Sequence, residues 1–431
     1  MGYERQVEAF VEFIRSGEKI RDDFKIGVEV EHFVVKNSNL ESLTYYEEKG
    51  IEYILKKLVK MGYEPVYEGD YLVGLNGKDE VITLEPGGQL EISINATPSL
   101  HGIDEKYIGF LNKIIPILDE NEQLLMPIGY HPKSSINDIP FNPKKRYSHM
   151  AEYFKSTGTH GHNMMKGTAS LQVVIDYSDE DDFIKKFRVA NFLSPLLHLI
   201  TDNAPIFEGK LYEKNIVRSR IWENTDKDRS SIVAGALGEK FGYREYSQYI
   251  LNTPPIFIMK GNEIINTGAK KARHVIDIDN ILRKEIDHIF SMVFPDVRVR
   301  NYIEIRMGDT LPYPLNLAYV ALIKGIFYSD TALKHLFEIT QSVEEEKIHL
   351  AKWSIEEMGF QGKFIGKSVK DIIAVLFDLA EQGLNESEKG YLRPLKELAL
   401  DQKNPAIIMK EKIKLEGIDA IKENALNHYR R

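Results

Sequence analysis

Four short stretches of the sequence alternate apolar residues with acidic or amide residues. Glu29 and Glu31 alternate with valines, Glu91 stands between Leu and Ile, and Gln172 and Glu304 repeat the pattern further along the chain. Period-two alternation is typical of strands, whose successive side chains point to opposite faces of a sheet. One such strand would indicate a solvent-facing surface. Because glutamate is depleted in strands, four strands that each present Glu or Gln favour a concave acidic site.

Carboxylates gathered on one face repel one another and need a positive counter-charge. Oxygen ligands without His pairs or cysteines suit Mg²⁺ or Mn²⁺, and these ions usually arrive with nucleotide phosphates. Arg306 follows Glu304 by two positions and therefore shares its face, where it could contact a phosphate or a developing negative charge. These residues alone predict a metal and phosphate site.

A second polar cluster, RSRIWENTDKDR (218–229), places one of the two tryptophans among three arginines. It indicates either a charged surface loop or an anion-binding loop for a carboxylate or a phosphate. The usual nucleotide motifs are missing, because the sequence has no G-x-G and GKFIGKS (362–368) is one residue short of a P-loop. His160 and His162 lie in a Gly-flanked turn without a third imidazole nearby, so we do not expect a histidine metal site there.

Composition limits the classes of protein that remain. The 431 residues include 56 Lys and Arg against 65 Asp and Glu, which gives a net charge of −9, and there is no cysteine. The lack of cysteine excludes disulfides, zinc–thiolate sites, iron–sulfur clusters and a cysteine nucleophile. The acidic balance disfavours a nucleic-acid or anionic membrane surface. Without an apolar run of ~18 residues or a signal peptide, we expect a cytoplasmic protein with no membrane partner.

The elements that must position these residues follow from hydrophobic periodicity. Strands are predicted at 25–35, 80–94, 169–177 and 300–307. One helix is predicted before the first strand, at 3–16, and another between the first two strands, at 47–61. Later helices are predicted at 315–328, 342–358, 368–382, 389–399 and 405–428, with Ser342 and Glu345 as a capping box. We therefore predict a single α+β domain, 1–431, with a strand-rich core at 20–314 and a helical C-terminal part at 315–431 that is not independent.

Six blocks of sequence, in order, resemble the glutamate–cysteine ligase (γ-glutamylcysteine synthetase) family, in particular its plant-type branch. They are IGVEVEHF (26–33), LEPGGQLEIS (84–93), NDIPFNPKKRY (137–147), SLQVVIDYSDEDD (170–182), RSRIWENTDKDR (218–229) and NYIEIRMGD (301–309). The resemblance implies a glutamine-synthetase-like fold, in which an antiparallel sheet cups the active site with ATP, Mg²⁺ and glutamate. It also implies ligation through a γ-glutamyl phosphate that the amine of cysteine attacks, the first step of glutathione-type thiol synthesis.

Matching motif positions carry the family's roles onto this chain. The resemblance implies metal ligands among Glu29, Glu31, Glu85, Glu91 and Glu304. It implies catalytic roles for Glu304 and Arg306, and substrate binding by Arg218, Arg220, Trp222 and Tyr302. Nucleotide binding is implied for Gln172, Asp228 and Arg229.

Two departures from the plant-type pattern concern the acceptor. Arg220 stands where that branch has His, and Gly167 stands where it has Arg, with Lys166 next door as a substitute. Because of these two departures, an alternative is a glutamate–amine ligase that uses a different small amine as the acceptor. A catalytically silent scaffold is a further alternative, which the retained acidic residues disfavour.

Overall fold

The computed structural model describes residues 2–261 and 263–429, so residues 1, 262 and 430–431 of the predicted domain lie outside the described part. A nine-stranded antiparallel sheet has the order β14-β15-β7-β1-β5-β4-β3-β2, and β6 extends it by pairing with the end of β1. Its strands are β1 (Ile26–Lys36), β2 (Glu64–Glu68), β3 (Tyr71–Asn76), β4 (Glu80–Leu84), β5 (Leu90–Thr97), β6 (Gln123–Met126), β7 (Ser170–Ile175), β14 (Val297–Val299) and β15 (Ile303–Asp309). Short two-stranded pairs join β8 (Ile206–Phe207) to β9 (Lys210–Leu211), β10 (Ser230–Ser231) to β13 (Phe294–Pro295), β11 (Phe257–Lys260) to β12 (Glu263–Asn266), and β16 (Lys363–Phe364) to β17 (Lys367–Ser368).

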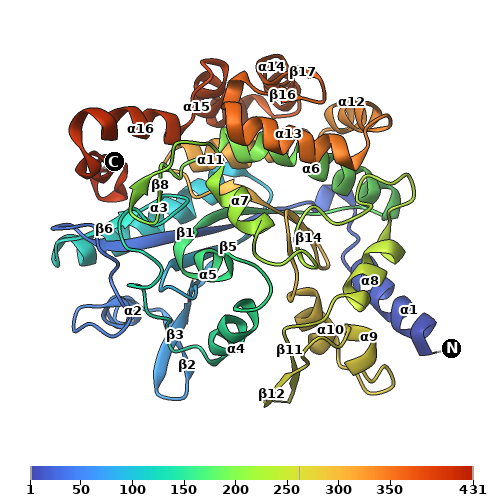
Figure 1. The fold of residues 1–431 in the computed structure, drawn as a ribbon, viewed down its shortest axis with the longest axis horizontal. Coiled ribbons are helices and arrows are strands. Elements are labelled where there is room, and N and C mark those ends of the chain that lie inside the picture. Colours follow the sequence, from blue (N-terminus) through green and yellow to red (C-terminus); the bar gives the residue numbers. More distant parts are fainter. Residues whose placement is uncertain (1, 262, 430–431) are drawn as a thin grey trace.

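Helices surround this sheet (Figure 1). Those before the last sheet strand are α1 (Gly2–Arg15), α2 (Ile51–Val59), α3 (Leu100–Asp119), α4 (Lys145–Phe154), α5 (Gly161–Gly167), α6 (Glu180–Ile200), α7 (Val217–Glu223), α8 (Tyr243–Asn252), α9 (Ala272–Val275) and α10 (Arg283–Phe290). The later ones are α11 (Leu315–Phe327), α12 (Asp330–Thr340), α13 (Glu345–Met358), α14 (Val369–Gln382), α15 (Glu386–Leu400) and α16 (Pro405–Glu416). Short 3₁₀ helices are η1 (Arg21–Asp23), η2 (Gly359–Gln361), η3 (Ile418–Asn424) and η4 (Leu426–His428).

The apolar face of the sheet is buried under three helices. Val28, Ile92, Val173 and Ile305 share this face and are buried. Helices α3, α6 and α11 pack on it, and α14 and α15 in turn pack on α11. Figure 1 shows the C-terminal helices, in orange and red, gathered along one side of the sheet. The opposite face of the central strands is therefore left to the polar residues.

The α+β class with an antiparallel sheet is confirmed, whereas two element boundaries are wrong. The predicted strand 80–94 is a hairpin of β4 and β5, because Pro86 and two glycines interrupt the ladder. The predicted helix 405–428 ends at Glu416, where Gly417 adopts a φ of 86°. The capping box at Ser342 is also absent, since α13 begins after Glu344. That the chain is a single domain stays a prediction.

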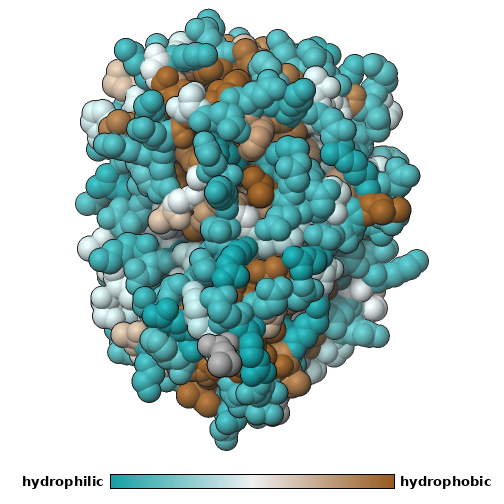
Figure 2. All heavy atoms as spheres, turned by 90° about the vertical axis from the view of Figure 1, so that its right-hand side faces the viewer, coloured by the Kyte–Doolittle hydropathy of each residue, from teal (hydrophilic) through white to brown (hydrophobic). Residues whose placement is uncertain are grey.

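Helix α6 was not predicted, although it is among the longest in the described residues. Nearly every residue from Lys186 to Ile200 is buried, so the helix has no polar stripe to reveal its period. The face of the molecule that carries α1 and α8 to α10 is mostly hydrophilic (Figure 2). Among the described residues, no helix is both long and apolar enough to cross a membrane.

The contact between α11 and α14 gives a stability prediction. A Cβ at Gly325 would lie 2.2 Å from the carbonyl oxygen of Ala380, so Gly325→Ala forces the two helices apart. We expect a loss of about 1–3 kcal/mol in the free energy of unfolding, measured by urea denaturation. Gly109→Ala in α3 is the control, because nothing lies within 4 Å of its Cβ position. A Gly325→Ala protein as stable as the wild type would contradict the predicted close packing.

Candidate active site

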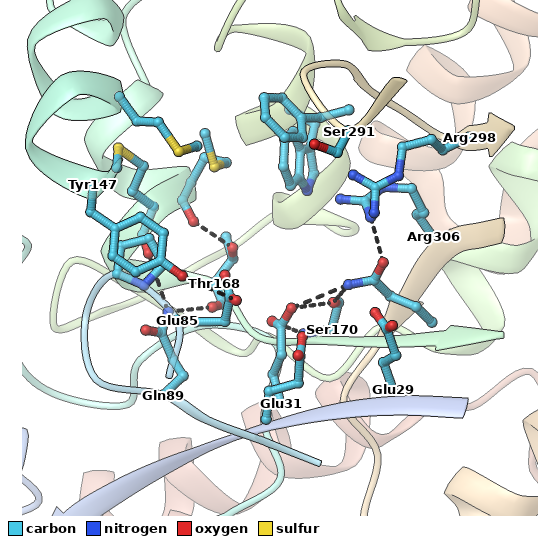
Figure 3. A pocket seen from close by; sticks show the side chains of 18 of the residues that line it. Glu29, Glu31, Glu85, Gln89, Tyr147, Thr168, Ser170, Ser291, Arg298 and Arg306 are labelled. Carbon is cyan, nitrogen blue, oxygen red and sulfur yellow. Dashed lines mark hydrogen bonds between the residues drawn. The ribbon is translucent and has the colours of Figure 1, made fainter. Parts of the chain in front are cut away.

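The register of the sheet brings the predicted acidic residues together. Glu29 of β1 lies opposite Gln172 of β7, and Glu31 of β1 lies opposite Glu91 of β5. Side chains at opposed positions on neighbouring antiparallel strands lie close together on one face. Figure 3 shows Glu29 and Glu31 rising from β1 into a cavity above the sheet. The alternation in the sequence therefore places these side chains on one face, as predicted.

The turn between β4 and β5 adds Glu85 to the same cavity. The turn is closed by a hydrogen bond of 2.9 Å from the Glu85 N–H to the Gln89 carbonyl. Gly88 adopts a φ of 87°, which glycine reaches without strain. At Gly87 a Cβ would lie 2.7 Å from the Lys166 carbonyl oxygen, so the turn packs tightly on α5.

The wall of the cavity has three chemically distinct parts (Figure 3). Its polar floor consists of Glu29, Glu31, Glu85, Gln89, Glu91, Thr168, Ser170 and Gln172. Apolar and aromatic side chains form the second part, namely Tyr147, Met150, Met164, Met165, Trp222, Met292 and Phe294. The third part consists of the arginines Arg146, Arg218, Arg298, Arg300 and Arg306.

Burial and mutual repulsion favour the protonated forms of Glu29, Glu31 and Glu91. Burial and then the nearby Glu91 and Glu304 raise the pKa of Glu29 well above its ordinary value. Burial, followed by the charges of Glu85 and Glu91, raises the pKa of Glu31 to about 8. The pKa of Glu91 is raised to about 7 by burial and by Glu85. Neighbouring acids with raised pKa values in one cavity are typical of a site that receives a positive charge.

The donor set of the floor fits a hard divalent cation. It offers carboxylate and amide oxygens, the ligand types that Mg²⁺ and Mn²⁺ prefer. Within residues 2–261 and 263–429, no three acidic or histidine side chains are gathered closely enough to enclose one ion. Mg²⁺ in phosphate-transfer sites typically takes one or two carboxylates and completes its shell with phosphate oxygens and water. A dispersed row of carboxylates is compatible with that mode of binding.

Glu304 lies beneath the arginine wall and does not line the cavity. Its carboxylate accepts two hydrogen bonds from Arg298, of 2.5 and 2.9 Å, and one of 3.1 Å from Arg306. Although burial acts in the opposite direction, the charges of Arg298 and Arg306 lower the pKa of Glu304 to about 2. In this structure Glu304 holds two arginines in place, and its metal-binding and catalytic roles stay predictions.

A bulge in β15 directs Arg306 into the cavity. The pairing of β15 with β7 skips from Ile305 to Gly308, so two residues of β15 face one residue of β7. The Arg306 guanidinium donates to the side-chain oxygen of Gln172 and lies 5.7 Å from the Trp222 ring. Figure 3 shows Arg306 beside Arg298 at the end of the floor where Glu29 lies. The role of Arg306 toward a phosphate stays a prediction.

Helix α7 carries two of the predicted substrate residues into the cavity and one away from it. Arg218 and Trp222, one helical turn apart, line the cavity. The guanidinium of Arg218 donates to the carbonyl oxygens of Arg306 at 2.9 Å and Met307 at 3.0 Å. Arg220 instead forms an ion pair of 2.7 Å with Glu356 of α13 and does not line the cavity.

The other predicted substrate and nucleotide residues support the cavity from outside. The hydroxyl of Tyr302 accepts a hydrogen bond of 3.1 Å from Arg300, which lines the cavity itself. Arg229 is buried and donates to Asp226 at 2.6 Å and to the Met292 carbonyl at 2.9 Å. Asp228 follows in the same loop, and its N–H donates to Asp226 at 3.0 Å. The structure does not bring these three predicted residues, Tyr302, Asp228 and Arg229, to the cavity wall, and their roles stay predictions.

The neighbourhood of Gly167 leaves no room for a larger side chain. A Cβ at Gly167 would lie 2.5 Å from the ring of Tyr130. Lys166 does not fill the role of the plant-type arginine in this structure, because its ammonium group donates to the Ile139 carbonyl at 2.8 Å and to the Ile136 carbonyl. Its charge therefore supports the loop ahead of α4.

Sequence reasoning assigned no role to eight polar residues that line the cavity: Arg146, Tyr147, Arg298, Arg300, Gln89, Thr168, Ser170 and Ser291. Arg298 of β14 and Arg300, which directly follows the strand, alternate with Val297 and Val299, the same period-two signal that identified the glutamates. The strand is only three residues long, which is too short for that signal to stand out. Arg146 and Tyr147 end the block NPKKRY, which was noted for its resemblance without assigned roles.

Known proteins resemble this chain over most of its length. The family described as glutamate–cysteine ligase family 2 matches residues 25–406. A chloroplastic glutamate–cysteine ligase of Arabidopsis thaliana is 30% identical over 410 residues, which cover 93% of this chain and 78% of the relative. The chloroplastic enzyme of Medicago truncatula is 28% identical over 409 residues, covering 92% of this chain and 80% of the relative.

A solved structure shows the same fold. The glutamate–cysteine ligase of Francisella tularensis, determined in complex with AMP, gives a TM-score of 0.58 at 14% identity and covers 96% of this chain and 90% of that chain. Such a low identity demonstrates similarity of fold alone. Together with the family match, it confirms the resemblance that the sequence blocks indicated. The chain belongs to glutamate–cysteine ligase family 2.

Proposed function

We propose that this protein uses ATP to join the γ-carboxylate of glutamate to the amine of cysteine, forming γ-glutamylcysteine. The observation that carries the proposal is that Glu29, Glu31, Glu85 and Glu91 line one cavity together with five arginines, in a chain of this family. The name of the plant relatives supports the same reaction.

The reaction needs charge neutralisation and alignment more than a protein nucleophile. A carboxylate is a poor acylating agent, so ATP first converts it into an acyl phosphate, and two anions must meet for that step. Arg306, Arg298 and Arg300 lie together on one side of the cavity, where they would bind and orient the transferring phosphoryl group. The amine of cysteine would then attack the acyl carbon and release phosphate.

Mg²⁺, or Mn²⁺ in its place, would be held by Glu29, Glu31, Glu85 and Glu91. Glu304, which does not line the cavity, stays a predicted ligand. When bound, the ion supplies positive charge that draws the nucleotide phosphates to the floor. Gln172, itself part of the floor, donates to Glu31 and accepts from Arg306, which supports its predicted place near the phosphates. Arg218 and Trp222 would form the amino-acid side of the cavity.

The test is cysteine-dependent turnover. With ATP, Mg²⁺ and glutamate, we expect ADP release to rise when cysteine is added, to stop with EDTA, and to yield a product with the mass of γ-glutamylcysteine. A panel of small amines, compared by kcat/KM, asks whether another acceptor is preferred. No stimulation by cysteine would contradict the proposal, and a better non-thiol amine would replace cysteine as the acceptor. The expected cytoplasmic location and the expected lack of nucleic-acid partners stay predictions.

A further inference from the structure

Helix α7 has two faces with different tasks. Arg218 and Trp222 point to the cavity, whereas Arg220 and Glu223 contact α13 of the helical C-terminal part. In Figure 1, α7 lies between the sheet and α13. Residues three and four apart share a helix face, so this seven-residue helix presents one pair to each side.

The contact between α7 and α13 consists of two ion pairs whose spacing matches. Arg220 lies 2.7 Å from Glu356, and Glu223 lies 3.4 Å from Lys352. Lys352 and Glu356 are one turn apart on α13, so the two pairs lie one after the other along the helices. The two partners on α13 are mostly buried, with Glu356 11% and Lys352 4% exposed, whereas Arg220 and Glu223 on α7 are 46% and 34% exposed.

Further hydrogen bonds fix the start of α7 to the same helix. The backbone N–H of Asn215 donates to the Glu356 carbonyl at 3.0 Å, and its side chain donates to the same oxygen at 3.2 Å. Ile216 adopts a φ of 48°, which is rare for a branched residue, and its N–H donates to Asp202 at 2.9 Å. The entry into α7 is therefore held in a strained conformation by its surroundings.

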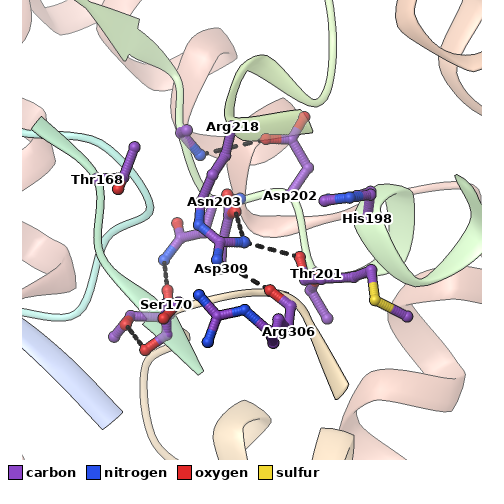
Figure 4. Close-up of polar contacts among 12 residues, drawn as sticks. Thr168, Ser170, His198, Thr201, Asp202, Asn203, Arg218, Arg306 and Asp309 are labelled. Atoms are coloured by element: carbon purple, nitrogen blue, oxygen red, sulfur yellow. Dashed lines mark hydrogen bonds and ion pairs between the residues drawn. The ribbon is translucent and has the colours of Figure 1, made fainter. Parts of the chain in front are cut away.

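The other face of α7 contacts the part of β15 that presents Arg306. Arg218 donates to both carbonyl oxygens of the bulge, at 2.9 and 3.0 Å, and lies 3.8 Å from Asp309 (Figure 4). Asp309 in turn accepts a hydrogen bond of 2.9 Å from the N–H of Asn203. A shift of α7 would therefore move Arg218, and with it the backbone that directs the Arg306 side chain.

We propose that Arg220 and Glu356 are positioning residues for the ligase reaction, and that their ion pair sets the place of α7 and so of Arg218 and Trp222 in the cavity. This inference rests on the proposed function. It differs from the expectation that Arg220 binds a substrate, because the guanidinium of Arg220 faces the C-terminal helices. A misplacement of ~1 Å at a site can cost about 100-fold in rate, so a modest shift of α7 has a measurable effect.

A charge exchange separates positioning from direct substrate binding. We expect Arg220→Glu and Glu356→Arg each to lower kcat/KM by about tenfold, mainly through a higher KM for the amino-acid substrates. The double variant restores an opposite-charge pair and is expected to recover most of this loss. If Arg220 bound a substrate carboxylate, the double variant would stay as impaired as Arg220→Glu. That result would overturn the inference.

A matched control tests whether a charge reversal elsewhere on the surface also lowers kcat/KM. Arg393 and Glu397 form an exposed ion pair of 2.6 Å one turn apart on α15, and neither lines the cavity. Arg393→Glu is therefore expected to keep wild-type kcat/KM. A tenfold loss there as well would show that any surface charge reversal lowers activity, which would also count against the inference.

Fluorescence gives a readout that needs no turnover. The chain has two tryptophans, and Trp353 of α13 is 62% exposed, so Trp353→Phe leaves Trp222 as the reporter of α7. In that background, each single charge reversal is expected to change the emission of Trp222 and its quenching by acrylamide. The double variant is expected to restore both the emission and the quenching of the wild-type pair. Unchanged emission in the single variants would overturn the inference. If the wild type shows no cysteine-stimulated ADP release, the proposed function fails, whereas Trp222 still reports whether the pair positions α7.

Discussion

The Arg306→Ala variant is expected to lose about 100- to 1,000-fold in kcat while it keeps the wild-type fold. Arg306 is 9% exposed, faces the cavity from the β15 bulge and contacts Gln172. Removal of one preorganised donor to a developing negative charge typically costs this much. Its loss leaves Glu304 paired with Arg298, so no buried carboxylate becomes unpaired. Steady-state kinetics and circular dichroism measure the two effects.

Two further variants make this prediction specific. Arg306→Lys keeps the charge but loses the planar guanidinium, so its kcat should lie between those of the wild type and Arg306→Ala. Arg283 in α10 does not line the cavity, and Arg283→Ala should keep wild-type kcat. If Arg306→Ala turned over at nearly the wild-type rate, the phosphate side of the cavity would lie elsewhere.

The Glu31→Gln variant is expected to lose about 100-fold or more in kcat and yet to be more stable than the wild type without ligands. Glu31 is buried beside Glu85 and Glu91, and its pKa is raised from 4.5 to about 8. At pH 8 the cost of ionising this carboxyl therefore destabilises the ligand-free protein relative to Glu31→Gln. Gln keeps an oxygen that accepts the Ser170 N–H, which lies 2.7 Å from Glu31.

The pH dependence of stability gives the sign of this effect. The pKa of Glu31 is higher in the folded state, so the protonated carboxyl contributes fully to the free energy of unfolding below pH 4.5. This contribution is lost as the pH rises from 4.5 to about 8. The stability difference between Glu31→Gln and the wild type should therefore grow over this interval, as measured by thermal unfolding without nucleotide. Glu48 is exposed, and Glu48→Gln serves as the control with no such growth. A Glu31→Gln protein less stable than the wild type at pH 8 would contradict the prediction.

Local periodicity was sufficient to predict which side chains share a face. The backbone of a strand points successive side chains to opposite sides, so Glu29, Glu31 and Glu91 could be assigned to one face without knowledge of the strand order. The sheet then placed Glu31 opposite Glu91. Helices with one apolar stripe, such as α1 and α14, were predicted for the same reason, since their period is visible in the sequence.

Contacts between distant segments were beyond the reach of periodicity. Glu304 shares a face with Arg306 in the sequence pattern, yet the structure buries it against Arg298 of the neighbouring strand. Arg220 stands two residues from Arg218, but a helix turns their side chains to different partners. Ion pairs of this kind depend on which elements pack together, which the local pattern does not report.

The sequence was enough to assign the family and the acidic face of the sheet, and its lack of cysteine excludes a disulfide within the chain. These properties depend on residue identity and on the fixed periods of strands and helices. Only the folded structure shows that Arg146, Arg298 and Arg300 join Arg218 and Arg306 in the cavity, and that α13 contacts α7. The reason is physical: a buried charge is placed by the partners that compensate it, and those partners come from distant parts of the chain.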